Sequence, residues 1–553
     1  MSRNENGIKL VPVSALYKVL PYAEPFHTER GSFLRGEIYD FQIAYKSEHV
    51  IWNASIRASG ELAQFLTIRE ELLAPVTFTA EDADDYYLEE GRCCLIPDAL
   101  AFPRVTGLNV PPDQWRAVWV TLEVPDGFKA GDYRIRFEFV TPEGEVLAET
   151  SFTAEFIDAR LPKTNLRLTN WMHYDCIAYQ HNVTLFADDF YRVFGAYLDA
   201  YTKIGFNMLL TPLLTPPLDT EVGGERTTAQ LIKIEVTKDG YQFDFSELKK
   251  FILFAQAHGI KYFELSHLFT QWGGKATPKI VAVENGEEKR IFGWDVTSES
   301  EEYREFLAAF LPSLTRELEK IGVKDKCVLH VTDEPCENDL ETYAKCREIV
   351  KKYSDIPVLD ALSNYSFYNR GYVDLPAVLI DSAEEFYENG IRDILLYTCC
   401  LPAGGYYTNR FINMPSERTR VLGVQLYESG AKGYLHWGFN FHNSYLSKTP
   451  IDPYKETDAA GAYPCGDGFI VYPNGDGINL SLRAELIKAG FNDYRALRLL
   501  ESIIGRDAVL SLLHEKGYSG FTNYPHSASA LKELRESVNA MIKNEINKKE
   551  KRK

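Results

Sequence analysis

The stretch Lys326-Cys327-Val328-Leu329-His330-Val331-Thr332-Asp333-Glu334-Pro335 joins an apolar run to two adjacent carboxylates and a proline. Its apolar and β-branched residues predict a short buried strand that ends abruptly at the charged pair. A buried strand with charges only at its tip is typical of the catalytic rim of a barrel. We therefore expect the rest of the chain to build a site around Asp333 and Glu334.

Strand alternation indicates where the two carboxylates point. It places Glu334 on the same face as His330, and it places Asp333 on the opposite, more apolar face. Glu334 is thus predicted to point into the barrel mouth, in an extended conformation imposed by Pro335. Asp333 reaches the mouth only if the end of the strand bends. The alternative is a purely structural role, in which Asp-Glu-Pro begins a loop that caps the next helix.

Strands and helices alternate on both sides of this stretch, from residue 161 onward, which predicts a parallel sheet. Eight strands are expected, at residues 166–171, 206–210, 260–266, the opening stretch, 358–362, 377–380, 394–397 and 433–437. The helices that follow strands five and six look short. Eight such units make a (β/α)8 TIM-type barrel over residues 161–500 the economical fold.

The chain before and after the barrel has a different pattern. Residues 114–124, 133–139 and 151–156 read as strands, several with one apolar and one polar face, so residues 1–160 are predicted to form an all-β sandwich. Residues 459–477 are rich in Gly and Pro and predict a long loop at the rim. Residues 501–553 are expected to form a C-terminal helical extension with a basic tail, so the fold class is multidomain.

Composition excludes several classes of function. A net charge of −19 over 553 residues disfavours nucleic acid and anionic membranes as partners. There is no apolar signal core at the N-terminus and no run of about 18 apolar residues, which predicts a cytoplasmic protein. The nine cysteines lack zinc-site spacing, and the glycines around Asp467 do not lie between a strand and a helix as a nucleotide site requires. We expect neither a metal nor another cofactor.

Aromatic and polar residues follow strands one, three, seven and eight, where the catalytic rim of a barrel lies. Each of them is also compatible with core packing, loop-internal hydrogen bonds or, for Asp467, a tight turn. The candidates for substrate binding are Trp171, His173, Asp175, His267, Trp272, Tyr397, Trp437, Asn440, His442 and Asp467.

Several motifs between about residues 165 and 500 together resemble the catalytic domain of glycoside hydrolase family 123. They are His330-Val-Thr-Asp-Glu-Pro335, Tyr397-Thr-Cys-Cys400, Asn409-Arg-Phe411, Met414-Pro-Ser416, Gly433-Tyr-Leu-His-Trp-Gly-Phe-Asn440, Ser481-Leu-Arg-Ala-Glu485 and Asn492-Asp-Tyr494. Characterised members of that family are retaining β-N-acetylgalactosaminidases that use the acetamido group of the substrate as nucleophile. The resemblance implies a glycan partner, a barrel preceded by a β-sandwich, and a catalytic pair at Asp333 and Glu334.

The chemistry of strand seven agrees with this resemblance. An ordinary retaining glycosidase needs two carboxyl groups roughly 5 Å apart, and the nucleophile often lies at strand seven. Here that strand ends at Tyr397-Thr398-Cys399, without an acid. The resemblance then implies that Glu334 protonates the leaving oxygen and that Asp333 accepts the acetamido N–H. Tyr397 would donate to the acetamido oxygen, and Trp437 would be a platform for the sugar ring.

Other interpretations stay open. One is a different retaining or inverting glycosidase, in which Glu334 works with Glu264 or Asp381 as the second carboxylate. Another is a protein that binds carbohydrate without cleaving it. A metal-dependent hydrolase is disfavoured because no rim shows clustered ligand spacing. The sequence leaves open the configuration of the sugar and whether the protein is a homo-oligomer.

Overall fold

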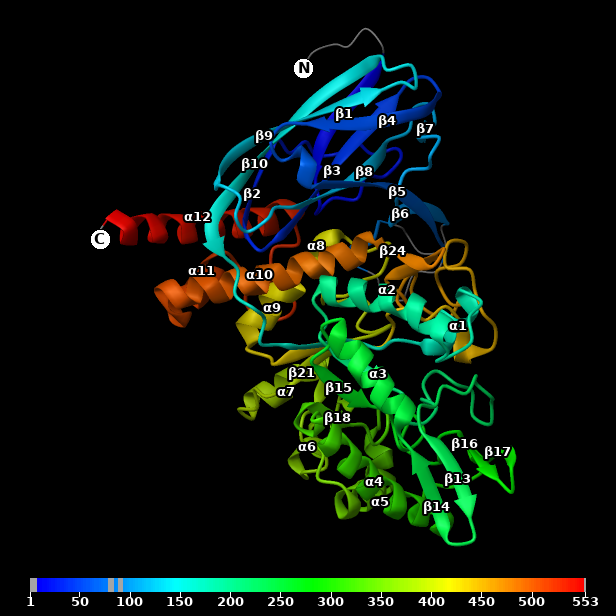
Figure 1. The fold of residues 1–553 in the computed structure, drawn as a ribbon. Coiled ribbons are helices and arrows are strands. Elements are labelled where there is room, and N and C mark those ends of the chain that lie inside the picture. The colour runs from blue at the N-terminus through cyan, green and yellow to red at the C-terminus, as the bar shows by residue number, and fades with distance from the viewer. Residues whose placement is uncertain (1–6, 78–83, 88–92, 552–553) are drawn as a thin grey trace.

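The computed structural model describes residues 7–77, 84–87 and 93–551, and its N-terminal part contains two β-sheets packed face to face (Figure 1). Phe41 of one sheet stacks on Phe152 of the other, with ring centroids 4.2 Å apart, in a core of buried apolar side chains. The seven-stranded sheet has the order β1 (Ile8–Ser14), β3 (Ile38–Ser47), β8 (Arg116–Glu123), β5 (Leu66–Val76), β6 (Cys94–Ala101), β24 (Gly477–Ser481), β23 (Val471–Asn474). The five-stranded sheet has the order β2 (Arg30–Arg35), β10 (Val146–Arg160), β9 (Gly131–Val140), β4 (Ile51–Ser59), β7 (Leu108–Val110).

A hairpin from far along the chain completes the seven-stranded sheet. Strands β23 and β24 pair antiparallel, and Leu480 and Ser481 of β24 pair with β6. The predicted loop over residues 459–477 is therefore wrong in its last part. Val471 and Tyr472 are buried against the sheet, and Gly475 turns the chain with a φ of 55°.

All eight predicted strands of the second part are present and lie in one sheet. The order is β18 (Cys327–Leu329), β15 (Tyr262–Leu265), β12 (Met208–Thr211), β11 (Arg167–Asn170), β22 (Gly433–His436), β21 (Leu395–Thr398), β20 (Ala377–Leu379), β19 (Ala361–Leu362). All of the ladders in this sheet are parallel. A separate parallel bridge between Leu329 and Val358 brings its two outer strands, β18 and β19, together. The complete (β/α)8 barrel stays a prediction, because this bridge lies outside the ladder.

Helices follow the strands of this sheet and bury one apolar face against it. α2, for example, buries Phe190, Phe194 and Tyr197, and it ends at Gly205, whose φ of 122° suits a helix terminus. The helices in chain order are α1 (Tyr174–Gln180), α2 (Asp188–Ile204), α3 (Ser246–Ala257), α4 (Glu301–Ile321), α5 (Leu340–Tyr353), α6 (Tyr365–Asn369), α7 (Ala383–Glu388), α8 (Ser416–Arg420), α9 (Leu422–Ser429) and α10 (Leu482–Ile504). As predicted, α6 and α7, which follow strands five and six, are short.

A four-stranded sheet inserted into the second part is absent from the sequence prediction. It lies at the bottom of Figure 1 and has the order β14 (Gly240–Asp244), β13 (Lys233–Thr237), β16 (Ile280–Glu284), β17 (Glu287–Phe292). Its hairpins turn at Lys238-Asp239, which Gly240 follows, and at Asn285-Gly286, a dipeptide that favours tight β-turns. The insertion follows β12 and β15, so it extends the loops at the carboxyl ends of those strands.

The C-terminal helices connect the two parts. After α10 come α11 (Arg506–Glu515) and α12 (Ala528–Lys551), and α12 lies beside β2 and β10 (Figure 1). Arg535 of α12 binds Glu37 at 2.7 Å and Asp493 of α10 at 2.9 Å. The predicted division at residues 160 and 500 stays a prediction, but elements from the end of the chain reach the N-terminal sheets.

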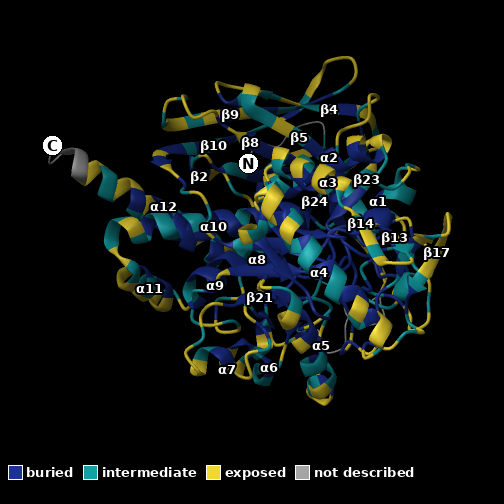
Figure 2. Ribbon diagram, turned by 60° about the horizontal axis from the view of Figure 1, so that its bottom comes forward, coloured by how far each residue is buried: buried dark blue, intermediate teal, exposed yellow. Residues whose placement is uncertain are grey.

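Burial follows the layers of the fold. In Figure 2 the buried residues fill the centre beneath α4 and α8, and the exposed residues lie on outer helix faces and loops. Among the described residues, no helix combines the length and apolar character that crossing a membrane requires.

Candidate active site

Strand β18 ends earlier than predicted, and the chain then bends. The strand ends at Leu329, and Glu334 adopts a left-handed conformation with a φ of 42°. The predicted extended conformation of Glu334 is therefore wrong. A left-handed conformation costs a non-glycine residue about 1–3 kcal/mol, so the surroundings must hold it. One such contact is the backbone N–H of Trp272, which donates to the carbonyl of Asp333 at 2.9 Å. The bend that an inward-facing Asp333 requires is thus present.

Both carboxylates line one small cavity of about 110 Å³. Asp333 is half-buried and Glu334 is exposed, so the pair remains accessible from the cavity. The Tyr397 hydroxyl donates a hydrogen bond to Glu334 Oε1 at 2.9 Å. The other lining residues are Trp171, Leu218, Asp219, Gln271, Trp272, Ala361, Thr398, Cys399, Cys400, Leu435, Trp437 and Tyr463. The arrangement combines a carboxyl pair with a wall that is mainly aromatic and apolar.

The environment favours the protonated forms of this pair. Loss of hydration raises the pKa of Asp333 well above its ordinary value, and the neighbouring charge of Glu334 adds to this effect. The pKa of Glu334 is also raised, first by loss of hydration and then by Asp467, whereas the hydrogen bond from Tyr397 lowers it. Two neighbouring carboxyl groups whose titrations are coupled tend to lose their protons in two separate steps. One of them can therefore act as an acid while the other is an anion.

A buried polar chain lies beneath the pair. The His330 ring is within 3.1 Å of Glu264 Oε2 and 3.2 Å of Asp360 Oδ1, and all three side chains are inaccessible to solvent. These hydrogen bonds raise the pKa of His330 to about 9, against the opposing effect of burial. Trp171 Nε1 also donates to Glu264, at 2.9 Å. Since Glu264 does not line the cavity, its predicted role as a second catalytic carboxylate is not supported by the geometry.

The other predicted second carboxylate, Asp381, lies elsewhere. It lines a different cavity, beside α7, and does not contact the site of Glu334. Neither of the two acids proposed for an ordinary two-carboxylate mechanism therefore faces the catalytic pair. Asp219, in contrast, lines the same cavity as the pair.

Four of the predicted substrate-binding residues line the cavity with the pair: Trp171, Trp272, Tyr397 and Trp437. Trp437 is fixed by its Nε1 group, which donates to Asp467 Oδ2 at 2.8 Å. Trp272 is 41% exposed and stands at the edge of the cavity. The three indole rings and the Tyr397 phenol ring thus line the same cavity as the two acids, as the predicted positions of these residues at the rim suggest.

Six predicted residues do not line the cavity, and they brace the loops around it. Asp175 binds Arg226 through both carboxylate oxygens, at 2.8 and 3.1 Å. His173 accepts a hydrogen bond from the same Arg226 at 3.0 Å and lies 3.0 Å from the carbonyl of Trp437. Asn440 makes two hydrogen bonds to the backbone of His173, at 2.9 and 3.0 Å. These residues hold the loop after β11 against the loop after β22.

The remaining three are buried. His442 contacts the carbonyl of Val471 at 3.1 Å, and His267 stacks on His330 with ring centroids 4.4 Å apart. Asp467 lies behind Trp437, and burial raises its pKa to about 6. Direct contact with a ligand in the cavity is not supported for these residues, although Asp467 contacts Trp437, which lines the cavity, and His267 contacts His330, which lies beneath the pair.

The cavity residues that the sequence interpretation missed include Asp219 and Tyr463. Asp219 lies in the loop after β12 with a φ of 42°, and its Oδ1 accepts a hydrogen bond from the Tyr463 hydroxyl. The other oxygen, Oδ2, is buried and makes no hydrogen bond of ordinary geometry to the described residues. The position of Asp219 after strand two, at the catalytic rim, could have identified it as a candidate. The intervening Thr-Pro-Pro-Leu run, however, does not indicate in which direction its side chain points.

Within residues 7–77, 84–87 and 93–551, no group of three or more His, Cys, Asp or Glu side chains is arranged to hold a metal ion. The cavity presents its carboxyl groups, the Tyr397 hydroxyl and aromatic walls to a ligand.

Comparisons with known proteins agree with the motifs and the geometry. The model of the glycoside hydrolase 123 catalytic domain matches residues 171–500. The structure is similar to that of a family 123 glycoside hydrolase from Clostridium perfringens, which was studied for glycolipid glycan hydrolysis. The TM-score is 0.73 at 16% identity, with 98% of this chain and 97% of that chain covered. An endo-β-1,4-mannanase from Thermotoga petrophila matches with a TM-score of only 0.35 at 15% identity, over 60% of this chain and 77% of that chain. No curated protein matches the sequence.

Proposed function

Because this chain belongs to glycoside hydrolase family 123, we propose that it cleaves a β-linked N-acetylhexosamine, N-acetylgalactosamine in the first instance, with retention of configuration. The observation that carries this proposal is the position of Asp333 and Glu334 on one cavity, with Glu334 bound to Tyr397. We further infer that the eight-stranded parallel sheet is a closed (β/α)8 barrel, which would present the pair at its catalytic rim.

Glu334 is the proton carrier in this proposal. As the acetamido oxygen of the substrate attacks the anomeric carbon, the glycosidic bond breaks and Glu334 gives its proton to the leaving oxygen. Glu334 then takes a proton from water as that water opens the cyclic oxazolinium intermediate, which restores the β configuration. A raised pKa suits the first step, because the carboxyl group must hold a proton near neutral pH.

Asp333 is the partner of the acetamido group. Its carboxylate accepts the N–H and stabilises the positive charge that develops on nitrogen as the ring closes. The bend after β18 supports this role, because it brings Asp333 into the cavity beside Glu334. Tyr397 lies close enough to Glu334 to donate to the acetamido oxygen once substrate displaces part of their contact.

The walls of the cavity suggest how the sugar binds. Trp171, Trp272 and Trp437 offer apolar ring surfaces for the faces of a pyranose. Asp219 and Tyr463 supply polar groups to the same cavity and are proposed to bind sugar hydroxyls. The related Clostridium perfringens enzyme, studied for glycolipid glycan hydrolysis, makes glycolipid glycans the first natural substrates to assay.

A second candidate keeps Glu334 but uses a protein nucleophile. Asp219 lines the same cavity, and its Oδ2 oxygen has no ordinary hydrogen bond to the described residues. That combination would suit a retaining glycosidase with two carboxyl groups. It would not require a 2-acetamido group on the substrate, which separates it from the first proposal.

A panel of chromogenic glycosides with three variants tests the assignment. We expect the wild type to cleave an N-acetyl-β-hexosaminide, and Asp333→Asn and Glu334→Gln each to lower kcat by about 10²- to 10⁴-fold. Asp219→Asn should chiefly raise KM. If hydrolysis persisted in both Asp333→Asn and Glu334→Gln, the assignment of the active site to this pair would be wrong. Binding of sugar without any turnover by the wild type would favour a carbohydrate-binding protein instead.

A further inference from the structure

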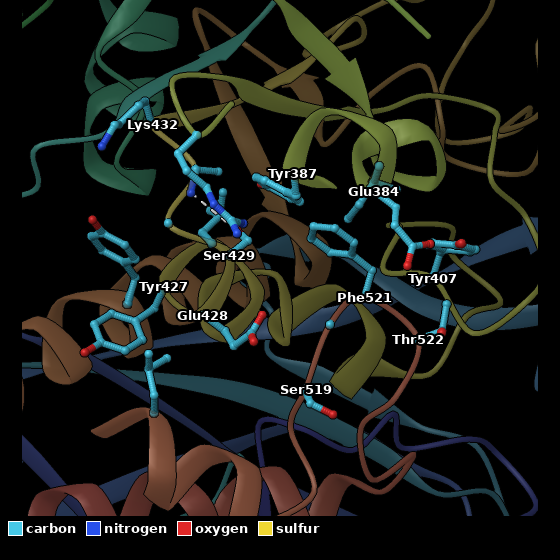
Figure 3. A pocket seen from close by; sticks show the side chains of 18 of the residues that line it. Glu384, Tyr387, Tyr407, Tyr427, Glu428, Ser429, Lys432, Ser519, Phe521 and Thr522 are labelled. Carbon is cyan, nitrogen blue, oxygen red and sulfur yellow. Dashed lines mark hydrogen bonds between the residues drawn. The ribbon is translucent and has the colours of Figure 1, made fainter. Parts of the chain in front are cut away.

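A second, larger cavity of about 1030 Å³ lies on the flank of the parallel sheet. It occurs beside the short helix α7 and also borders α9, and residues 519–522 of the C-terminal extension cover one side (Figure 3). A full-length helix after β20 would fill more of this flank. The cavity therefore follows from the short element that the sequence already indicates at this point.

The flank cavity is separate from the catalytic cavity. The two have no lining residue in common. Arg392 and Lys432 line the flank cavity directly before β21 and β22, whereas Asp333 and Glu334 follow the carboxyl end of β18. Since parallel strands share their direction, part of the flank cavity lies toward the opposite end of the sheet. Asp381, Glu384 and Tyr407, in contrast, line the flank cavity after the carboxyl ends of β20 and β21, the end that carries Asp333 and Glu334.

The charges around the flank cavity favour a neutral ligand. Four acidic and four basic residues line it, although the chain as a whole carries a net charge of −19. The bases are largely engaged: Arg498 binds Glu501 at 2.8 Å, and Arg506 donates to the carbonyls of residues 427 and 428 at 3.1 and 3.2 Å. Few cations thus remain for a phosphate or other anion.

The acidic side chains that line the flank cavity form fewer ion pairs and hydrogen bonds than the basic ones. In the described part of the chain, Glu384 and Glu388 form no ion pair or hydrogen bond through their side chains, and Asp381 bonds only to the adjacent Ser382 hydroxyl, at 3.0 Å. Free carboxylates accept hydrogen bonds from hydroxyl groups. The cavity therefore offers acceptors to a ligand rich in O–H donors.

Aromatic rings stand beside these acceptors. Tyr387 and Phe521 stack with centroids 6.0 Å apart, and Tyr407 lies near Glu384 in Figure 3. Burial raises the pKa of Tyr407, with Asp381 and Glu384 adding to the effect, which agrees with their closeness. An aromatic face next to free carboxylates is the combination that binds a sugar ring, whose C–H face is apolar and whose edge carries hydroxyls.

We propose that the flank cavity is a second saccharide-binding site, in which Tyr407 stacks on a sugar ring and Glu384 and Asp381 accept its hydroxyls. This proposal rests on the proposed function for its ligand class, a glycan. A glycosidase that holds a glycan at two places gains affinity for long chains over short ones. A volume of about 1030 Å³ is at the upper end for small-ligand sites and accommodates several sugar units.

Calorimetric titration of the full chain tests this site. The probe is a tetrasaccharide that ends in β-linked N-acetylgalactosamine, and the protein carries Glu334→Gln to prevent turnover. We expect two saturable sites, with Tyr407→Ala weakening one of them about tenfold or more while Tyr407→Phe leaves both near their original affinity. In the otherwise wild-type enzyme, Tyr407→Ala should leave hydrolysis of a small aryl glycoside unchanged.

Tyr22→Ala is the matched control, because Tyr22 is 82% exposed on the N-terminal part, away from both cavities. A single site in every variant, or two sites that Tyr407→Ala does not affect, would overturn the proposal. So would saturable binding of spermidine or ATP, but not of the saccharide, at a site that depends on Tyr407. Release of product in the Glu334→Gln background would instead reveal a failure of the proposed function, which the titration distinguishes by analysing the sugars afterwards.

Discussion

The chemistry of the site depends on how Asp333 and Glu334 share a proton. Loss of hydration in the cavity raises the pKa of both groups. The charge of Glu334 adds to this effect at Asp333 and the charge of Asp467 adds to it at Glu334, where the Tyr397 hydroxyl opposes it by stabilising the anion. In the proposed mechanism the protonated Glu334 is the active form of the free enzyme. The alkaline limb of kcat/KM should therefore report the pKa of this proton.

Two variants should move that limb in opposite directions. Asp333→Asn removes a neighbouring negative charge, so the pKa of Glu334 falls and the limb moves to lower pH. Tyr397→Phe removes a hydrogen bond that favours the anion, so the pKa rises and the limb moves to higher pH. We expect shifts of about 0.5–1 pH unit, measured on an activated aryl glycoside.

Tyr463→Phe provides the control for this comparison, because its hydroxyl lies in the same cavity but binds Asp219. It should leave the limb where it is. If both test variants shifted the limb in the same direction, Glu334 would not be the group that it reports.

The sequence indicates Asp333 and Glu334 as the candidate catalytic pair, but it does not give the direction in which the two carboxyl groups point. Alternation points Asp333 away from the mouth, and it fails here because the strand ends at Leu329 and the chain bends before the pair. That bend depends on contacts with another loop, such as the bond from Trp272 to Asp333. For the same reason the sequence indicated Tyr397 and Trp437 correctly as rim residues but missed Asp219, whose loop path is set by tertiary contacts.

Among the secondary elements, buried strands were easier to predict than hairpins. The eight strands of the parallel sheet are buried on both faces. They therefore appear in the sequence as short continuous apolar runs, which are easy to recognise. The inserted four-stranded sheet exposes many of its side chains, and its residues, like those of the hairpin β23/β24, resemble polar loops. Asn-Gly and Asp-Gly at their turns were the available signal.

Helix α10 begins at a buried ion pair that joins the two parts of the protein. Arg483 donates to both oxygens of Asp98 in β6, at 2.9 and 2.8 Å, and neither side chain is accessible to solvent. Arg483→Met leaves the Asp98 carboxylate buried without its cation. We expect the free energy of unfolding to fall by about 3–5 kcal/mol, measured by chemical denaturation.

Arg498→Met is the matched control in the same helix. Arg498 is 40% exposed in its ion pair with Glu501, so this substitution should cost about 1 kcal/mol or less. Equal losses of stability in the two variants would show that the pair with Asp98 is not a specific connection between α10 and the N-terminal sheet.

The assembly of the whole chain was the least predictable feature. Composition changes near residues 160 and 500 suggest three consecutive units, yet β23 and β24 complete an N-terminal sheet, and Arg535 of α12 binds Glu37. Such contacts join residues hundreds of positions apart, and no local pattern encodes them. They matter for function because the segment that carries Asp467 leads directly into that hairpin.

The central claim is that the substrate supplies the nucleophile and that Asp333 and Glu334 serve it. The most direct measurement is kcat/KM for a series of aryl N-acyl-β-galactosaminides with acetyl, fluoroacetyl, difluoroacetyl and trifluoroacetyl groups. Fluorine withdraws electron density from the attacking amide oxygen, so the account predicts a steep fall in kcat/KM along the series. A rate that does not change with fluorination would contradict the account and assign the attack to a protein carboxylate such as Asp219.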